Sequence, residues 1–478
     1  MTLVDLQALL PLTILGAGSL VVMLQIALIR RPVITVSLTV LTLLLAAASA
    51  CRGGVVTQVT PLLLSDAYAR LFTVLFCLAG VVTTLLSTGY LSQRGDEPED
   101  FYLLLILSTL GACVLAFATH LASLLLGLEL LSVALYALIA YPNKALLPLE
   151  AATKYLVLSG AASATTLFGF ALLYAATGTL SFDAMGKALA ASDELRLLEA
   201  AAVMVVAGLA FKLSLTPFHL WTPDVYQGAP APVTGFLATV SKAAVLVVLL
   251  RWFDLGGLLR YPDLVQVMAV LAILSMLAGN LLALRQDNIK RMLAYSSIAH
   301  MGYLLIVFAA ASVAGSHSFA LEAAAFYLVA YTATTLAAFA PLAMMSAGQG
   351  GGERCLLQDL SGLFWRAPGA ALLMLLAMLS LAGIPLTAGF LAKFYLVGAA
   401  SGSGHWLLLG SLVVGSAIGI YYYLRVVFTM SRRPGDNPGA PEMNGHWPPR
   451  LATWLLAAAI LWLGILPQQL LHHLASIL

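Results

Sequence analysis

Residues 230–252 read PAPVTGFLATVSKAAVLVVLLRW, a stretch whose only charges are Lys242 near its centre and Arg251 close to its end. A helix rises about 1.5 Å per residue, so about 20 residues cross the roughly 30 Å hydrocarbon core of a bilayer. This stretch is therefore long and apolar enough to cross a membrane, and it would carry a lysine into the apolar interior.

Comparable apolar stretches recur along the whole chain. Of its 478 residues, 61% are hydrophobic and 9% are charged, whereas about a quarter of the residues of a soluble globular protein are charged. The stretch from Leu9 to Ile29 is longer than a signal-peptide core, and Arg30 and Arg31 follow it, so we expect a retained first helix. The composition predicts an all-α polytopic membrane protein with a single transmembrane domain over residues 1–478.

The positions of proline, glycine and charge clusters divide the chain into about fourteen spans. Their approximate cores lie at residues 9–29, 33–50, 67–90, 101–118, 121–140, 151–176, 197–222, 230–252, 263–284, 290–311, 318–346, 367–400, 404–430 and 449–474. The segment from Ser181 to Arg196 is too polar to cross, and we expect it to be amphipathic and to lie at the surface.

Positively charged residues are distributed unequally between the two sides. The connections on one side carry twelve, namely Arg30, Arg31, Arg94, Lys144, Arg285, Lys290, Arg291, Arg354, Arg366, Arg432, Arg433 and Arg450. The other side carries four, namely Arg52, Lys187, Arg196 and Arg260. Because positive residues concentrate in cytoplasmic loops, the first set is predicted to be cytoplasmic and both termini to lie outside.

Several classes of site are not indicated. The net charge of +2 gives no basic patch for nucleic acid, and no glycine-rich phosphate loop, zinc spacing or Ser/His/Asp arrangement occurs. The cysteines, Cys51, Cys77, Cys113 and Cys355, are far apart and are interpreted as buried small side chains. We therefore expect no cofactor-binding and no metal-binding residues in this chain.

Four charged residues are predicted to lie deep inside apolar spans. They are Glu129 in HLASLLLGLELLS, Lys212 in GLAFKLSLTPFHLW, Lys242 in FLATVSKAAVLVVLL and Lys393 in IPLTAGFLAKFYLV. A charge at the bilayer centre costs on the order of 3 kcal/mol, so each needs a partner, water or a function. One interpretation is structural ion pairing that fixes helix register. The other is proton transfer, because burial lowers the pKa of a lysine from about 10.4 toward neutrality and a nearby carboxylate raises it.

Two of these lysines lie close to prolines that interrupt a helix. Pro217 follows Lys212 by about one turn, and Pro385 precedes Lys393 by about two. The two spans concerned, the seventh and the twelfth, are each fourth in a block of five, which indicates inverted repeats in spans 4–8 and 9–13. The predicted parts are three helices in residues 1–95, repeats in 100–254 and 262–433, and a last helix in 448–478.

Two histidines also lie inside spans. His300, in AYSSIAHMGYLL, is the rough counterpart of Glu129 in the second repeat. A histidine titrates near neutral pH and could relay protons between the lysines, or it could simply be hydrogen-bonded at a helix interface. For His219, beside a helix break, the structural interpretation is favoured. Tyr295, Ser296, Ser297 and Tyr303 could support a chain of waters or pack helices together.

The sequence around the charged positions resembles a known family. The run KLSLTPFHLWTPDVYQGAPAPVTGFLATVSKAAVL begins at Lys212, HLASLLLGLELLS precedes it, and NIKRMLAYSSIAHMGYLL and LSLAGIPLTAGFLAKFYL follow it. Together they are similar to subunit N of bacterial proton-pumping NADH:quinone oxidoreductase, respiratory complex I. The resemblance covers essentially the whole chain, and WTPDVYQGAPAP is its most specific part.

The resemblance implies an antiporter-like subunit of the membrane arm. In this family the fifth-span glutamate and seventh-span lysine pair, the eighth-span lysine relays and the twelfth-span residue ends the path; these roles fall on Glu129, Lys212, Lys242 and Lys393. The sister subunits L and M share the plan, but Lys393 in place of glutamate argues against M, and the lack of a lateral helix after the last span argues against L.

The resemblance also implies the surroundings of the chain. NADH, FMN, the iron–sulfur clusters and the quinone would be bound by other subunits, and this chain would bind none of them. Expected neighbours are subunit M, small subunits such as K and the lipid of a bacterial inner membrane, with no nucleic acid. Two alternatives to proton pumping remain open here: a multisubunit cation/proton antiporter, and a structural subunit whose buried charges only set packing.

Overall fold

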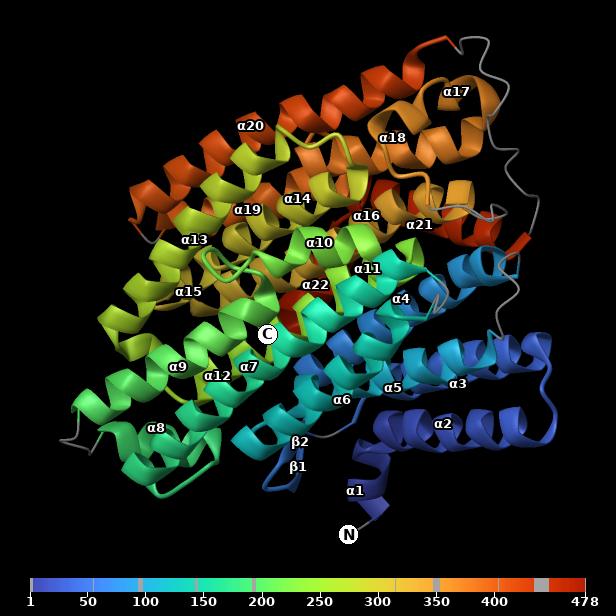
Figure 1. Cartoon of the computed structure of the whole chain (residues 1–478). Helices are drawn as coiled ribbons and strands as arrows, with labels where there is room; N and C mark the ends of the chain where they lie inside the picture. The colour runs from blue at the N-terminus through green and yellow to red at the C-terminus, as the bar shows by residue number, and fades with distance from the viewer. Residues whose placement is uncertain are drawn as a thin grey trace.

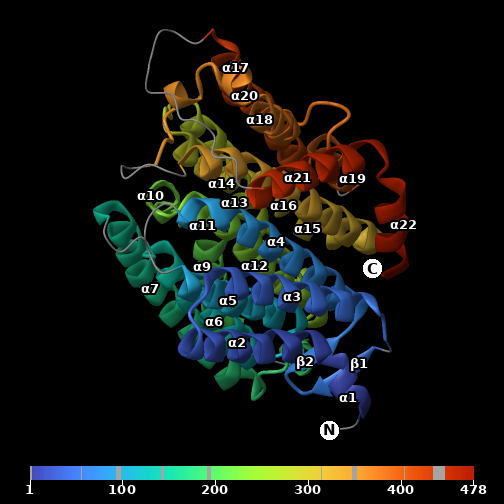
Figure 2. The same ribbon diagram turned by 90° about the vertical axis from the view of Figure 1, so that its right-hand side faces the viewer.

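The computed structural model describes residues 3–54, 56–92, 98–141, 145–190, 195–313, 315–346, 353–402, 404–433 and 447–477. Over these ranges the chain forms one bundle of long helices that run side by side, with α2 and α20 at opposite edges (Figures 1 and 2). Residues 230–253, which include Lys242, lie at the centre of the bundle, and every one of them is buried.

The helices follow the chain in four groups. The N-terminal group is α1 (Leu3–Ala8), α2 (Leu10–Leu28), α3 (Pro32–Cys51) and α4 (Ala67–Leu91). The next is α5 (Glu99–Phe117), α6 (Leu121–Ile139), α7 (Leu146–Thr177), α8 (Phe182–Ala190), α9 (Leu195–Leu213), α10 (Trp221–Gly228), α11 (Ala231–Phe236), the π-helix η1 (Leu237–Ser241) and α12 (Lys242–Leu255). The third is η2 (Leu258–Arg260), α13 (Pro262–Ala283), α14 (Ile289–Leu304), α15 (Ile306–Ala311), α16 (His317–Ser346), η3 (Leu357–Leu360), α17 (Leu363–Arg366), α18 (Pro368–Ala382), α19 (Ala388–Gly402) and α20 (Trp406–Ser431). The last is α21 (Trp447–Ile465) and α22 (Gln468–Ile477).

The predicted all-helical polytopic fold is confirmed. Among the described residues, 12 helical stretches are long and apolar enough to cross a membrane. The other two predicted spans, the seventh and the twelfth, are the interrupted ones, formed by α9 with α10 and by α18 with α19. The helices α18 and α19, with 15 residues each, are too short to cross alone, whereas α9 has 19 residues but carries Arg196, Glu199 and Lys212.

The structure differs from the predicted elements in two places. A short antiparallel hairpin, β1 (Thr57–Thr60) with β2 (Leu63–Ser65), precedes α4 and was not expected in an all-α chain. The predicted last span, 449–474, is two helices, because Pro467 follows α21 and lacks the N–H needed to continue it. The polar segment after Ser181 contains α8, where Lys187 pairs with Asp183 at 2.6 Å; residues 191–194 lie outside the described ranges.

Ion pairs connect helix ends that were predicted to share a side. On the predicted cytoplasmic side, Arg30 pairs with Asp100 at 3.0 Å and Lys154 with Asp224 at 3.0 Å. On the other side, Arg251 pairs with Asp66 at 2.8 Å, across the ends of α12 and α4. These three pairs join helix ends that an alternation of helix direction would place on the same side. Arg94, Lys144 and the side chain of Arg196, which belong to the counted charges, lie outside what the structure describes.

Helices α5 and α6 cross at two glycines. A Cβ at Gly111 would lie 2.5 Å from the backbone nitrogen of Leu131 and 3.0 Å from the Gly127 oxygen. Small residues allow such backbone approach, which drives helix association in membranes. The crossing also fixes the height of Glu129, which lies on α6 between Gly127 and Leu131.

Gly111→Ala is expected to destabilise the protein by about 1–3 kcal/mol, because the new methyl group must push α6 away. The measurement is the midpoint of thermal unfolding of the purified protein in detergent. Gly160→Ala is the matched control, since a Cβ at Gly160 on α7 meets no heavy atom within 4 Å. Equal midpoints for the two variants would mean that the α5–α6 approach contributes no stability.

Candidate functional site

Lys212 lies in the last turn of α9, immediately before the interruption of the seventh span. The helix ends at Leu213 because Ser214 takes a left-handed conformation (φ 62°) and Pro217 cannot continue the hydrogen-bond ladder. The indole Nε1 of Trp221, the first residue of α10, donates to the Phe211 carbonyl at 3.0 Å. The interruption is therefore a built turn whose freed backbone groups have partners.

The Lys212 ammonium group is buried between two serines. Its Nζ donates to Ser132 Oγ at 2.7 Å and to Ser159 Oγ at 2.6 Å, and the residue is 5% exposed. Ser132 comes three residues after Glu129, so both point from one face of α6. No ion pair within 4.0 Å joins Glu129 to Lys212.

Glu129 itself has an open hydrogen-bonding position. Its Oε1 is buried and has no partner among the described residues. An ionised carboxylate oxygen without a donor is costly in a protein interior, so this atom is where a donor or a proton is needed. No ion pair joins Glu129 to Lys212, so their separation is not fixed by direct contact.

Lys242 is completely buried at the point where the π-helix η1 passes into α12. Its Nζ donates to Ser297 Oγ at 2.7 Å and lies 5.4 Å from the centre of the Tyr226 ring. Ser297 also accepts from Tyr331 Oη at 2.8 Å. A π-helical turn commonly marks a functional position, because it displaces side chains from the regular α-helical register.

Two tyrosines lie next to the serines that hold Lys212. Tyr136 Oη donates to Ser159 Oγ at 2.6 Å, the same oxygen that Lys212 contacts. The Tyr136 and Tyr155 rings lie 5.2 Å apart edge to face.

His300 lies one turn beyond Ser297 on α14 and has a partner on each ring nitrogen. Nδ1 is 2.6 Å from Tyr327 Oη, and Nε2 is 3.2 Å from Tyr423 Oη. Tyr423 also contacts Ser296 Oγ. One of these tyrosines must donate and the other accept if His300 is neutral, so the pair can register a change of tautomer.

Lys393 is held by the end of a broken helix. Its Nζ donates to the carbonyls of Leu381 at 3.0 Å and Ala382 at 3.1 Å, the last residues of α18. A helix C-terminus carries partial negative charge and attracts a cation. The ammonium lies 5.5 Å from the centre of the Tyr303 ring.

The two interrupted helices do not place their lysines alike. Lys212 precedes Pro217 by five residues, and the residue five before Pro385 is Ser380. Ser380 Oγ lies 3.0 Å from Thr334 Oγ1 and accepts from the Gly389 N–H at 3.0 Å. Both interrupted helices have the break, whereas the charge lies before it in one and after it in the other.

Two charged residues that the sequence predicts in a loop or at the end of a span are buried in the structure. Lys290, counted among the cytoplasmic loop charges, is 0% exposed, and Arg251, noted only as an end-of-span charge, is 6% exposed. Both lie within a turn or so of a helix end, where a charge is easily taken for a loop residue. Within the described ranges no group of three or more His, Cys, Asp or Glu is arranged to hold a metal.

Comparison with protein families gives a match over most of the chain. The family model described as "NADH:quinone oxidoreductase/Mrp antiporter, TM" matches residues 118–419. NADH-quinone oxidoreductase subunit N of Methylococcus capsulatus is 46% identical over 481 residues, covering 100% of this chain and 96% of that protein. The subunit N of Ectopseudomonas mendocina is 46% identical over 480 residues, covering 97% and 95%.

Solved structures agree with the sequence matches. A chain of respiratory complex I from Thermus thermophilus, solved with bound aureothin, superimposes with a TM-score of 0.84 at 36% identity, covering 98% of this chain and 99% of that one. A chain of the Mrp complex of Dietzia has the same fold, with a TM-score of 0.84 at 22% identity, covering 100% and 97%. By full-length identity, the chain belongs to the NADH:quinone oxidoreductase/Mrp antiporter family and, within it, to the NADH-quinone oxidoreductase subunit N proteins.

Proposed function

We propose that Glu129, Lys212, Lys242, His300 and Lys393 form a proton path through the interior of this subunit. The chain is a proton-translocating, antiporter-like membrane-arm subunit of NADH:quinone oxidoreductase. The observation that carries the residue assignment is that every buried lysine donates to oxygen atoms in the interior. Lys212 and Lys242 donate to serine hydroxyls, and Lys393 donates to backbone carbonyls at the end of α18. Hydroxyl groups both donate and accept, so the serines beside Lys212 and Lys242 can pass a proton on, which supports a functional role for them.

The first step is assigned to Glu129 and Lys212. A redox-driven change elsewhere in the complex would alter the distance between them, and withdrawing a carboxylate from a buried ammonium weakens the hold on its proton in general. Ser132 and Ser159 accept hydrogen bonds from the ammonium group and keep it in place. What changes is therefore its distance from the Glu129 carboxylate, and with it the field that the carboxylate exerts. The unpartnered Oε1 is consistent with a carboxylate that changes partners.

Later steps run along α14. Lys242 contacts Ser297, and Ser296 and His300 share Tyr423, which leads toward the Tyr303 ring and Lys393. Hydroxyl and imidazole groups both donate and accept, so a proton can enter on one side as another leaves on the other. Lys393, bound only by carbonyl oxygens, is the assigned end of the path.

The proposal extends to the surroundings of the subunit. The chain is a multi-pass membrane protein of complex I, and we assign it to the bacterial inner membrane with both termini on the periplasmic side. NADH, FMN, iron–sulfur clusters and quinone are assigned to other subunits, and subunits M and K and lipid are the proposed neighbours. Residues 100–254 and 262–433 are the proposed repeats, flanked by 1–95 and 448–478.

Lys242→Met is the direct test of the relay. The thioether side chain fills a similar volume but cannot carry a proton, so NADH-driven proton uptake by inverted membrane vesicles should fall about tenfold or more. Assembly of the complex is measured in the same membranes. Lys154→Met is the matched control, because Lys154 is an exposed lysine on α7 and is not on the path.

Normal uptake by an assembled Lys242→Met complex would remove Lys242 from the path and with it the proposed continuity between the repeats. A fall in both variants would point instead to a general requirement for positive charge.

A further inference from the structure

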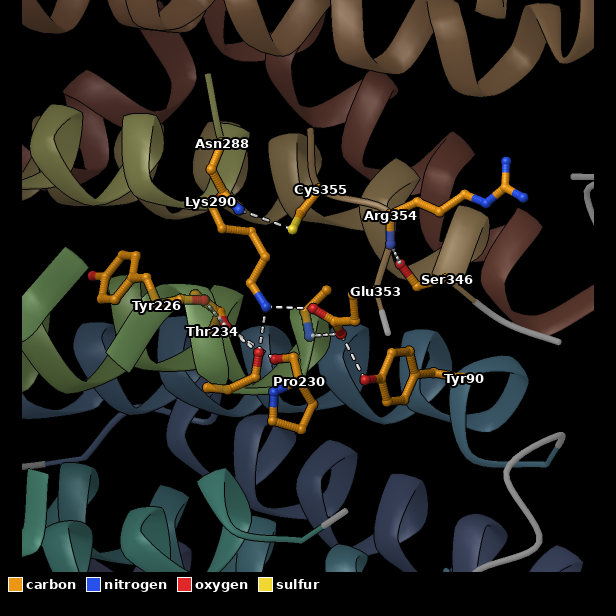
Figure 3. Close-up of polar contacts among 12 residues, drawn as sticks. Tyr90, Tyr226, Pro230, Thr234, Asn288, Lys290, Ser346, Glu353, Arg354 and Cys355 are labelled. Carbon is orange, nitrogen blue, oxygen red and sulfur yellow. Dashed lines mark hydrogen bonds and ion pairs between the residues drawn. The ribbon is translucent and has the colours of Figure 1, made fainter. Parts of the chain in front are cut away.

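Lys290 and Glu353 form a buried ion pair beside residues 229–230, the two-residue gap between α10 and α11 (Figure 3). The Lys290 side chain is 0% exposed and that of Glu353 is 12% exposed. Taking both charges out of water costs several kcal/mol per ion, which the attraction offsets only with additional hydrogen bonds. The remaining contacts of the pair therefore indicate what it holds.

Each member of the pair contacts the gap. Lys290 Nζ donates to the carbonyl of Ala229, and Glu353 Oε1 accepts from the N–H of Ala231 at 2.9 Å. Pro230 lies between Ala229 and Ala231 and has no N–H, so it cannot itself donate a hydrogen bond that would join α10 to α11. Glu353 Oε1 also accepts from Tyr90 Oη at 2.6 Å, which ties the gap to α4. The pair therefore supplies hydrogen-bond partners for the backbone carbonyl that follows α10 and for the backbone N–H at the start of α11.

The gap is directly connected to the environment of Lys242. Tyr226 on α10, three residues before Ala229, presents its ring to Lys242 Nζ and its hydroxyl to Ser297 Oγ at 3.3 Å. Ser297 lies on α14, and Lys290 lies in the first turn of the same helix. The bond from Lys290 to Ala229 therefore joins the two helices that provide the groups around Lys242.

We propose that Lys290 and Glu353 are positioning residues that set where Tyr226 and Ser297 stand relative to Lys242. The proposal rests on the proton path above. Moving either group changes the polar surroundings of the Lys242 ammonium, and with them the pH at which the relay works. Neither residue of the pair contacts Lys242, so their effect must be transmitted through α10 and α14.

The other titratable groups near Lys242 and near the Lys290–Glu353 pair are unchanged in the variants described below. Those facing Lys242 are Tyr226 on α10, His300 on α14, Tyr331 on α16 and His219 in the turn after α9. Those near the pair are Tyr90, Cys355 and Asp359. A shifted pH profile in variants of the pair is therefore not explained by loss of another titrating group.

The experiment compares Lys290→Met, Glu353→Gln and the double variant in the whole complex. Each single variant should lower the thermal stability, because it leaves a buried charge or carbonyl without its partner. The double variant removes both charges and should regain much of that stability. Its NADH-driven proton uptake should nevertheless remain about three- to tenfold below normal, with a displaced pH profile. The reason is that Ala229 and Ala231 still lack their contacts with Lys290 and Glu353.

Two further variants sharpen the test. Glu353→Asp keeps the charge and shortens the side chain, so the complex should assemble, with a pH profile between normal and Glu353→Gln. Cys355→Ser is the control, because Cys355 lies two residues from Glu353 and contacts Asn288 rather than the gap. Burial raises the pKa of the Cys355 thiol, so its replacement changes no charge at neutral pH.

Recovery of both stability and the normal pH profile in the double variant would overturn the positioning role and leave a structural ion pair. A normal profile in Glu353→Asp together with a normal profile in Glu353→Gln would do the same. Failure of the proton path itself is read separately, from an assembled Lys242→Met complex that pumps normally.

Discussion

Lys212→Met is expected to abolish most NADH-driven proton uptake, by about tenfold or more, while the complex still assembles. The ammonium group is the donor to two serines on different helices, and its loss removes the only charge that Glu129 is proposed to act upon. Quinone-linked turnover should fall together with uptake, because a blocked coupled step holds back the redox reaction.

The measurement is proton uptake by inverted vesicles beside NADH:quinone turnover, with assembly checked in the same membranes. Lys187→Met is the control, since the Lys187 side chain on α8 is 75% exposed and pairs with Asp183 one turn away. If the assembled Lys212 variant keeps both activities, the buried charges are structural and the path is wrong. Loss of the complex itself would call for Ser132→Ala with Ser159→Ala, which keeps the charge but removes its acceptors.

The fold was largely predictable because hydrophobicity is a local property of the sequence. The continuous spans follow from apolar length, and the two interrupted ones from Pro217 and Pro385. The hairpin before α4 was missed because strands of three or four residues leave no readable alternation next to long apolar helices. The division of the last span at Pro467 was missed although the polar residues Gln468 and Gln469 follow this proline.

The site was predictable in its charges but not in its connections. A charge inside an apolar span is visible at once, which is how Glu129, Lys212, Lys242 and Lys393 were found. The serines and tyrosines between them, such as Ser159 and Tyr155, are unremarkable in sequence, because small polar and aromatic residues also pack membrane helices.

Lys290 was misassigned for a different physical reason. The charge count treats every lysine near a span end as a loop residue, but the fold covers this end of α14 with α10 and the segment around Glu353. The residues 347–352, which join α16 to that segment, lie outside the described ranges. No local pattern links position 290 with position 353, so only the tertiary structure brings the pair together.

The second large effect is expected at Lys393, where replacing the ammonium with another cation separates charge from proton transfer. Lys393→Arg keeps a positive charge beside the carbonyls of Leu381 and Ala382, but a guanidinium does not release its proton in proteins. If Lys393 ends the path, uptake should fall about tenfold or more although the α18 end remains capped by a cation.

A companion variant alters the position of Lys393 and leaves its chemistry intact. Gly383 has a left-handed conformation (φ 82°), and a Cβ there would lie 3.0 Å from Lys393 Cδ, so Gly383→Ala should push the lysine from its two carbonyl partners. We expect an intermediate loss of proton uptake, measured in vesicles that contain equal amounts of assembled complex. Full activity in Lys393→Arg would show that position 393 needs only charge, and the end of the path would then have to lie at another residue.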